Sequence, residues 1–240
     1  MIQATRETVC AIIPACGEER FIGSVVRGAL EHLDHVVVVD DHSADQTARA
    51  AREAGAEVIR HSKNLGKGAA IKTGLGKVAD SFGYFLFMDG DGQHDPAEIP
   101  IFLAKAALTR AHLIVGNRMW NPATMPAIRR WTNQFMSWQI SKLCRQSLPD
   151  SQCGYRMTRC ELLPLLCESS NGFAFETESL ILTARNGFQI EFVPIRTIYR
   201  DERSKIKPMR DTLRYIRVLT KYRSDESRRT FQAANDSERQ

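Results

Sequence analysis

The chain has 240 residues, 43% hydrophobic and 25% charged, which suits one soluble domain that buries a core. No apolar stretch approaches the roughly 18 residues of a membrane span, and residues 1–8 are polar and mixed in charge, so we expect no signal peptide. The net charge of +5 is uneven, because residues 196–223 hold ten basic and three acidic side chains. This segment predicts a local anionic partner.

The first half of the chain alternates predicted strands and helices. Apolar runs predict strands at 9–13, 35–39, 56–60, 84–88 and 112–115. Helical spacing predicts helices at 21–33, 45–54 and 64–78, with another starting at Pro96. Continuous apolar strands separated by helices predict a mostly parallel sheet covered on both faces, a doubly wound α/β fold.

The second half has a different pattern. We predict helices at 127–144, 161–167, 176–186 and 208–222, strands at 189–193 and 197–199, and a polar turn at 150–156. Gly187 is expected to end the third of these helices. Residues 224–240 are polar and are predicted to be a disordered tail.

Polar residues follow the predicted strands where these end. Glu18 follows the first strand, Asp40 and Asp41 end the second, and Asn117 and Arg118 follow the fifth. Doubly wound sheets bind ligands at the carboxyl ends of their strands. These side chains are therefore expected around one crevice.

The fourth strand ends in the most informative of these segments, Asp89-Gly90-Asp91-Gly92. Mg²⁺ is typically held by one or two carboxylates plus substrate phosphates, and glycines allow phosphates to approach the backbone. An acidic turn is the alternative interpretation of this segment taken alone.

Other residues have plainer interpretations. The six cysteines show no metal-like spacing and are predicted to be buried free thiols. Trp131, Phe135 and Trp138 are predicted to lie in the core, with a platform for a sugar or a lipid as the alternative. Glu176 is predicted to be a solvated helix residue. His94 either caps the helix at Pro96 or belongs to the site.

Seven motifs in chain order together resemble one family. They are Pro14-Ala-Cys-Gly-Glu18, Val39-Asp-Asp-His-Ser43-x-Asp45, Asn64-Leu-Gly-Lys-Gly68, Asp89-Gly-Asp-Gly-Gln-His94, Gly116-Asn-Arg118, Asp150-x-Gln-x-Gly-x-Arg156 and Phe175-Glu-Thr-Glu178. The chain is similar to inverting family 2 glycosyltransferases of the GT-A fold, and within them to the dolichyl- or polyprenyl-phosphate mannose (or glucose) synthase type. The resemblance implies a single domain over 1–223, with a nucleotide-sugar half at 9–118 and an acceptor half at 119–223.

The resemblance also implies roles for matching positions. Expected catalytic residues are Asp91, Arg118 and Glu178. Expected nucleotide-binding residues are Pro14, Glu18, Asp40, Asp41, Lys67, Asp89 and Gly90. A Mg²⁺ or Mn²⁺ ion is expected on Asp89, Asp91 and Gln93. Expected acceptor or phosphate contacts are Arg129, Asp150, Gln152, Arg200, Ser204 and Lys205.

One departure concerns the nucleotide. The family's usual opening is Pro-x-Tyr-Asn-Glu, and Cys16 and Gly17 stand here for the Tyr and Asn. The identity of the base, UDP or GDP, therefore stays open, as does the sugar. A polyprenyl phosphate acceptor would be anionic at neutral pH and need no strong base. A hydroxyl acceptor would need one, for which Glu178 or Asp150 are the candidates.

Two further alternatives are weighed. A sugar-phosphate nucleotidyltransferase would open with a Gly-rich loop followed by Arg and Lys, which residues 14–20 are not. A basic module binding nucleic acid is disfavoured by the acidic strand ends, so no nucleic-acid partner is expected. The 208–222 helix carries Arg210, Arg214, Arg217 and Lys221 on one face. It predicts an enzyme that is peripheral on an anionic membrane surface, on the cytoplasmic side where nucleotide sugars occur. The alternative is that the apolar face of this helix packs on the sheet and its arginines are solvated.

Overall fold

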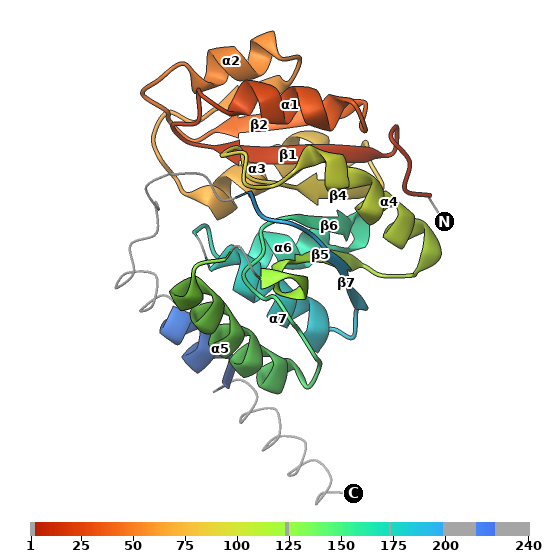
Figure 1. The fold of residues 1–240 in the computed structure, drawn as a ribbon. Coiled ribbons are helices and arrows are strands. Elements are labelled where there is room, and N and C mark those ends of the chain that lie inside the picture. Colours follow the sequence, from red (N-terminus) through yellow and green to blue (C-terminus); the bar gives the residue numbers. More distant parts are fainter. Residues whose placement is uncertain (1–2, 123–124, 173, 199–214, 224–240) are drawn as a thin grey trace, which may run out of the picture. The chain divides into compact units, whose positions relative to one another are not determined.

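The computed structural model describes residues 3–122, 125–172, 174–198 and 215–223, and divides the chain into two units, residues 1–202 and 203–240. The first unit contains a seven-stranded sheet of order β3-β2-β1-β4-β6-β5-β7 (Figure 1). Its strands are β1 Val9–Ala15, β2 His35–Asp40, β3 Glu57–Arg60, β4 Tyr84–Phe87, β5 Leu113–Asn117, β6 Arg156–Arg159 and β7 Ile190–Pro194. Strand β6 is antiparallel to β4 and β5, and the other pairs are parallel. The predicted mostly parallel sheet is confirmed.

Helices cover both faces of this sheet. They are α1 Ile22–Leu30, α2 Thr47–Glu53, α3 Lys67–Val78, α4 Ile99–Leu108, α5 Ala127–Cys144, α6 Leu163–Glu168 and α7 Phe175–Arg185, with short 3₁₀ turns η1 Pro96–Glu98, η2 Arg118–Trp120 and η4 Cys160–Leu162. Helices α1 and α2 pack together against β2, and α3 packs on β1 and β2. Side chains alternate along β1, so Ile12 lies beside Gly74 of α3 while Ile13 points to the other face.

The strand order reverses at β1. The chain runs outward from β1 through β2 to β3, then returns to place β4 on the other side of β1. In such sheets the ligand crevice lies at this reversal, outside the carboxyl ends of the strands. The end of β1 and the turn that follows β4 meet there, since a Cβ on Gly90 would lie 3.3 Å from the Cβ of Ala15.

Two strand predictions in the second half are wrong. Strand β6 lies within and after the stretch predicted as a polar turn, because its sequence Arg-Met-Thr-Arg has no apolar run although Met157 is buried. Thr197 and Ile198 are not in a strand; Ile198 N instead donates to Gln93 O at 3.1 Å. Tyr199 lies outside the described residues.

Helix α5 has the predicted bounds but not the predicted orientation. Trp131, Phe135 and Trp138 are exposed, so their assignment to the core is wrong. The buried side contains Asn133 and Ser137, which find hydrogen-bond partners inside, and α5 packs on α7. Polar side chains that form hydrogen bonds inside the protein can be buried at little cost in free energy. These polar residues of α5 are therefore buried while its aromatic residues are exposed.

The cysteine prediction holds in part. None of the six cysteines, all of which lie in the described residues, forms a disulfide, as expected. Cys10 and Cys153 are buried, whereas Cys167 is exposed. Burial raises the pKa of both buried thiols to about 12, so they stay protonated at neutral pH.

The second unit contributes a described helix at residues 215–223. Val218, Leu219 and Tyr222 are buried and Arg217 and Lys221 are exposed, as an amphipathic helix requires. The start of the predicted 208–222 helix and the tail 224–240 lie outside the described residues. Within the parts of the chain that the structure describes, no helix is long and apolar enough to cross a membrane.

Candidate active site

A tight turn follows β4 and carries the two carboxylates of the acidic motif. Gly92 has a φ of +75°, a left-handed conformation that favours glycine. Gln93 N donates to Asp91 Oδ1 at 2.9 Å, and Asp89 N donates to His94 Nδ1 at 3.0 Å. Asp95, not His94, caps η1, so the capping interpretation of His94 is wrong. The turn fixes both carboxylates at the carboxyl end of β4.

His94 is buried and neutral in this turn. Burial lowers the pKa of His94 to about 4, and its ring stacks on Tyr155 with centroids 5.0 Å apart. Its Nδ1 accepts a backbone hydrogen bond, so the proton of the neutral ring is on Nε2. His94 therefore positions the turn.

Lys67, the first residue of α3, lies between two acidic side chains. Its Nζ is 2.6 Å from Asp89 Oδ1 and 2.7 Å from Glu176 Oε1. Glu176 is only 6% exposed, so its assignment as a solvated helix residue is wrong. Its Oε2 is buried, and no group of the described residues donates a hydrogen bond to it. The signal that could have revealed Glu176 is its place in the Phe175-Glu-Thr-Glu178 motif, one helical turn that is buried throughout.

The two carboxylates of the turn have opposite pKa shifts. Burial opposes ionisation of Asp89, but the Lys67 ammonium holds the pKa of Asp89 at about 2. Burial, and then the negative charge of Asp89, raises the pKa of Asp91 to about 7. A cation bound beside Asp91 would therefore stabilise its ionised form.

The residues fit a divalent ion that is shared with a substrate. Among the described residues, no group of three or more His, Cys, Asp or Glu side chains could hold a metal alone. Asp89 and Asp91 supply two carboxylates, which with a diphosphate is the set that Mg²⁺ usually takes. Gln93, on the same turn, offers an amide oxygen.

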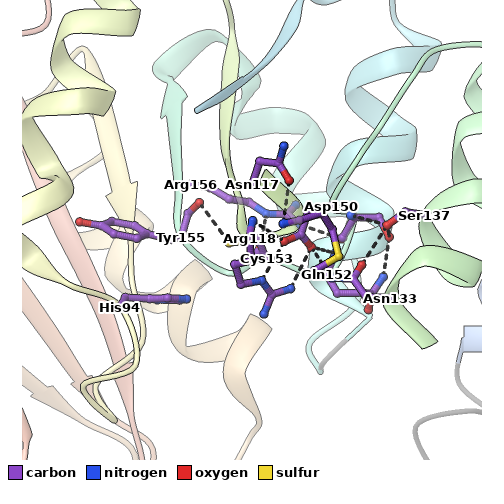
Figure 2. Close-up of polar contacts among 12 residues, drawn as sticks. His94, Asn117, Arg118, Asn133, Ser137, Asp150, Gln152, Cys153, Tyr155 and Arg156 are labelled. Atoms are coloured by element: carbon purple, nitrogen blue, oxygen red, sulfur yellow. Dashed lines mark hydrogen bonds and ion pairs between the residues drawn. The ribbon is translucent and has the colours of Figure 1, made fainter. Parts of the chain in front are cut away.

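Arg118 and Asp150 form the second part of the site (Figure 2). Asp150 Oδ2 accepts from Arg118 N and Nε at 3.0 and 2.8 Å, and Oδ1 accepts from Arg118 Nη2 and Asn133 Nδ2, both at 2.8 Å. Gln152 N also donates to Oδ1. Although burial opposes it, pairing with Arg118 holds the pKa of Asp150 below its usual value. The network fixes the guanidinium beside the end of β5.

Arg156 fastens the loop 150–154 to α7. Its buried guanidinium donates to Cys153 O and Ser151 O at 2.6 and 3.0 Å, and to Glu176 O and Ser179 Oγ of α7 at 2.6 and 2.7 Å. The sequence motif included Arg156, but this role was not predicted from it.

Gly154 brings the two parts together. A Cβ on Gly154 would lie 2.6 Å from Lys67 Nζ and 3.2 Å from Asp89 Oδ2. The positive charge of Arg118 also lowers the pKa of Asp89. The structure therefore gathers Lys67, Asp89, Arg118, Asp150 and Glu176 at one end of the sheet.

The expected nucleotide-binding carboxylates lie at the ends of β1 and β2. Asp41 accepts from Leu65 N and Gly66 N, both at 2.7 Å, and its Oδ1 is 2.8 Å from His61 Nδ1. Asp40 is buried; its Oδ1 accepts from Ser43 N, and its Oδ2 pairs with Arg60.

The loop that follows β1 completes this side of the site. Pro14 is buried in β1, and Glu18 N donates to Thr47 Oγ1 at 2.8 Å. The negative charge of Glu18 contributes to the raised pKa of Asp91, so this loop faces the metal turn.

The other expected site residues are less central or not described. Glu178 is buried and accepts a hydrogen bond from Ser170 N. Arg129 lies in the first turn of α5 and is half-buried. Arg200, Ser204 and Lys205 lie outside the described residues, so their roles stay predictions.

Comparison with known proteins agrees with the motifs. The family described as Glycosyl transferase family 2 matches residues 10–164. UDP-N-acetylglucosamine–dolichyl-phosphate N-acetylglucosaminyltransferase of Methanococcus voltae is 31% identical over 214 residues, covering 79% of this chain and 85% of that protein. Polyprenol monophosphomannose synthase of Mycolicibacterium smegmatis is 28% identical, covering 83% of this chain and 80% of that protein.

The solved structures agree on the fold. Glucosyl-3-phosphoglycerate synthase of Mycobacterium tuberculosis in complex with UDP superposes with a TM-score of 0.73 at 22% identity, over 90% of this chain and 79% of that one. A second crystal structure of that protein holds Mn²⁺ as well as UDP. With a family match over more than half of its length, the chain belongs to glycosyl transferase family 2.

Proposed function

We propose that this enzyme transfers a hexose from a nucleoside-diphosphate sugar to a polyprenyl phosphate, with inversion at the anomeric carbon. The observation that carries the proposal is the pair Asp89 and Asp91 at the strand reversal, where the positive charge of Arg118 acts on Asp89. Two relatives are named as a dolichyl-phosphate N-acetylglucosaminyltransferase and a polyprenol monophosphomannose synthase, which supports this acceptor class.

Asp89, Asp91 and Gln93 are the residues that would hold Mg²⁺ or Mn²⁺ in this proposal. The ion would supply Lewis-acid neutralisation of the departing diphosphate. Lys67 orients Asp89 through its 2.6 Å contact and is itself held by Glu176. Pro14, Glu18, Asp40, Asp41 and Gly90 would form the nucleoside side of the site.

Arg118 is proposed to contact a phosphate. Its bidentate pair with Asp150 fixes the guanidinium plane before substrate arrives, and preorganised charge is effective in catalysis. Arg129 lies in the first turn of α5, where backbone N–H groups also favour an anion. Together they would position the acceptor phosphate.

The state of the two candidate bases favours a phosphate acceptor over a hydroxyl. Asp150 has a lowered pKa and accepts from Arg118, Asn133 and Gln152, and Glu178 accepts from Ser170 N. The lowered pKa of Asp150 leaves this carboxylate poorly suited to take a proton near pH 7, and the Glu178 carboxylate is already engaged by a backbone donor. A phosphate monoester ionises near pH 6 and attacks without one.

We further propose that the enzyme works at a membrane surface on the cytoplasmic side. A polyprenyl phosphate resides in a bilayer, whereas the described residues form no membrane-spanning helix. The exposed Arg217 and Lys221 of the 215–223 helix agree with binding to anionic lipid.

The test is a donor panel. UDP- and GDP-linked hexoses and N-acetylhexosamines are incubated with a short water-soluble polyprenyl phosphate and Mn²⁺, and nucleoside diphosphate release is measured with and without EDTA. A parallel arm replaces the acceptor with its polyprenol. Metal-dependent transfer to the phosphate alone is expected; transfer only to hydroxyl acceptors, or undiminished transfer in EDTA, would refute the proposal.

A further inference from the structure

Helix α5 carries an exposed apolar stripe. Ile128, Trp131, Phe135 and Trp138 are 75%, 68%, 59% and 54% exposed. Their spacing of three and four residues places them on one face of the helix. The rings of Phe135 and Trp138 stack with centroids 6.1 Å apart, and Lys142 Nζ lies 4.1 Å from the Trp138 ring. We call these four residues the aromatic face.

The other side of α5 belongs to the active site. Asn133 Nδ2 donates to Asp150 Oδ1 at 2.8 Å, and Ser137 Oγ donates to Ser151 Oγ at 3.1 Å (Figure 2). A helix with its side chains is roughly 10–12 Å wide. Whatever binds the aromatic face therefore lies about one helix diameter from the residues that hold Arg118.

The charge of α5 indicates what binds there. Residues 127–145 contain Arg129, Arg130, Lys142 and Arg145 and no Asp or Glu. Trp concentrates at the headgroup level of membranes, and helices that lie in this interface combine Trp, Phe and aliphatic residues with Lys and Arg. A protein partner of the same chemistry would need a matching acidic rim, whereas anionic lipid supplies the negative charge along the whole helix.

We propose that the aromatic face of α5 is the surface by which this enzyme docks on an anionic lipid bilayer, which brings the active site to the headgroup of a membrane-borne acceptor. The inference rests on the proposed function for the identity of that acceptor. The proposed membrane contact of α5 belongs to the first unit and is separate from the contact proposed for the basic helix at 215–223.

Vesicle binding tests the surface directly. The triple variant Trp131→Gln, Phe135→Gln, Trp138→Gln is compared with Leu108→Gln, a matched control that removes an 84% exposed apolar side chain from α4. Co-sedimentation uses vesicles of phosphatidylcholine alone or mixed with phosphatidylglycerol. We expect wild type and the control to bind the mixed vesicles and the triple variant to lose at least tenfold in affinity. Equal binding by all three proteins would overturn the inference.

Fluorescence locates the contact. With Trp120 and Trp138 replaced by Phe, Trp131 is the remaining tryptophan, and brominated phospholipids should quench it if the aromatic face enters the lipid. Absence of quenching in bound protein would overturn the inference. A second result would also overturn it: a wild-type protein that is dimeric and does not bind vesicles, together with a triple variant that is monomeric. The aromatic face would then join two copies of the chain.

An activity assay separates this inference from the proposed function. On a short, water-soluble polyprenyl phosphate the triple variant should match wild type, and on a long-chain acceptor in vesicles it should fall at least tenfold. If wild type does not use the soluble acceptor, the proposed function fails. If wild type uses both acceptors and the triple variant keeps full activity in vesicles, the docking surface is wrong and the proposed function stands.

Discussion

Two carboxylates at the two sides of the site, Asp91 and Asp150, are held in opposite ways. Asp150 is fully buried and accepts from Arg118, Asn133 and Gln152, and its pKa is lowered. Asp91 follows β4 beside Asp89, and burial and that neighbour raise its pKa to about 7. The difference separates a carboxylate that the protein itself satisfies from one that a ligand must satisfy.

This comparison assigns different consequences to the same chemical change. Converting either aspartate to asparagine removes one negative charge at nearly constant volume. At Asp150 the change removes the negative charge that pairs with the Arg118 guanidinium at 2.8 Å, which costs stability. At Asp91 it removes a repulsion from the negative charge of Asp89, so stability is kept. Activity falls instead, because a carboxylate proposed to bind the metal is lost.

The largest expected effect is on activity in Asp91→Asn. Loss of a metal-binding carboxylate removes several kcal/mol of charge stabilisation, so transfer should fall by about 100-fold or more. The midpoint of denaturant unfolding should stay at or above that of wild type. The measurements are nucleoside diphosphate release and equilibrium unfolding, with Asp80→Asn, an exposed aspartate, as the control. Wild-type metal dependence in the variant would contradict the assignment.

The next effect is on stability in Asp150→Asn. Breaking the pair with Arg118 should lower the free energy of unfolding by about 3 kcal/mol, the lower end for buried pairs because Arg118 is 19% exposed. Urea unfolding at neutral pH measures this, again against Asp80→Asn. A loss no greater than that of the control would contradict the structural role of Asp150.

The acid dependence of stability gives a second check on Asp150. Its pKa is lower in the folded chain than in the unfolded chain, so its contribution is fully present above about pH 4 and disappears as the pH falls through the folded value. Asp150→Asn should therefore lose less stability than wild type between neutral pH and pH 3. Parallel curves for the two proteins would contradict the assigned shift.

A smaller effect is expected from Glu176→Gln. Lys67 then keeps its contact to Asp89 but loses one of its two carboxylate partners. The loss of a charge-assisted bond of about 1.5 kcal/mol should reduce transfer about tenfold through misplacement of Asp89. Glu168→Gln, at the exposed end of α6, is the matched control. If only the unfolding midpoint changes and kcat does not, Glu176 supports the fold and not the metal turn.

Much of this site follows from the sequence, because it depends on local order. The strands before Asp40, Asp89 and Asn117 are apolar runs, and a parallel sheet brings their ends together whatever the helices between them contain. The family and the strand-end carboxylates were therefore predictable from residues alone.

What was missed depends on partners distant in sequence. Glu176 looks like any acid in a first helical turn until Lys67, more than a hundred residues earlier, lies 2.7 Å away. Strand β6 has no apolar run and exists because β4 and β5 pair with both of its edges. The exposed face of α5 escaped prediction because Asn133 is buried by its bond to Asp150, which no periodicity reveals.

The smallest expected effect sharpens the comparison at the point where the two sides touch. In Gly154→Ala the added methyl would lie 2.6 Å from Lys67 Nζ, so the ammonium must shift away from Asp89 and Glu176. Because this atom is the end of a flexible side chain, stability should change little. A weakened charged contact of about 1 kcal/mol should reduce transfer about fivefold. Gly76→Ala is the control, since a Cβ on Gly76 of α3 meets nothing within 4 Å and should raise helix stability by up to about 1 kcal/mol. If both variants keep wild-type kcat, the close approach of the 150–154 loop to Lys67 has no part in holding the metal turn. Asp91 and Asp150 would then act independently of each other.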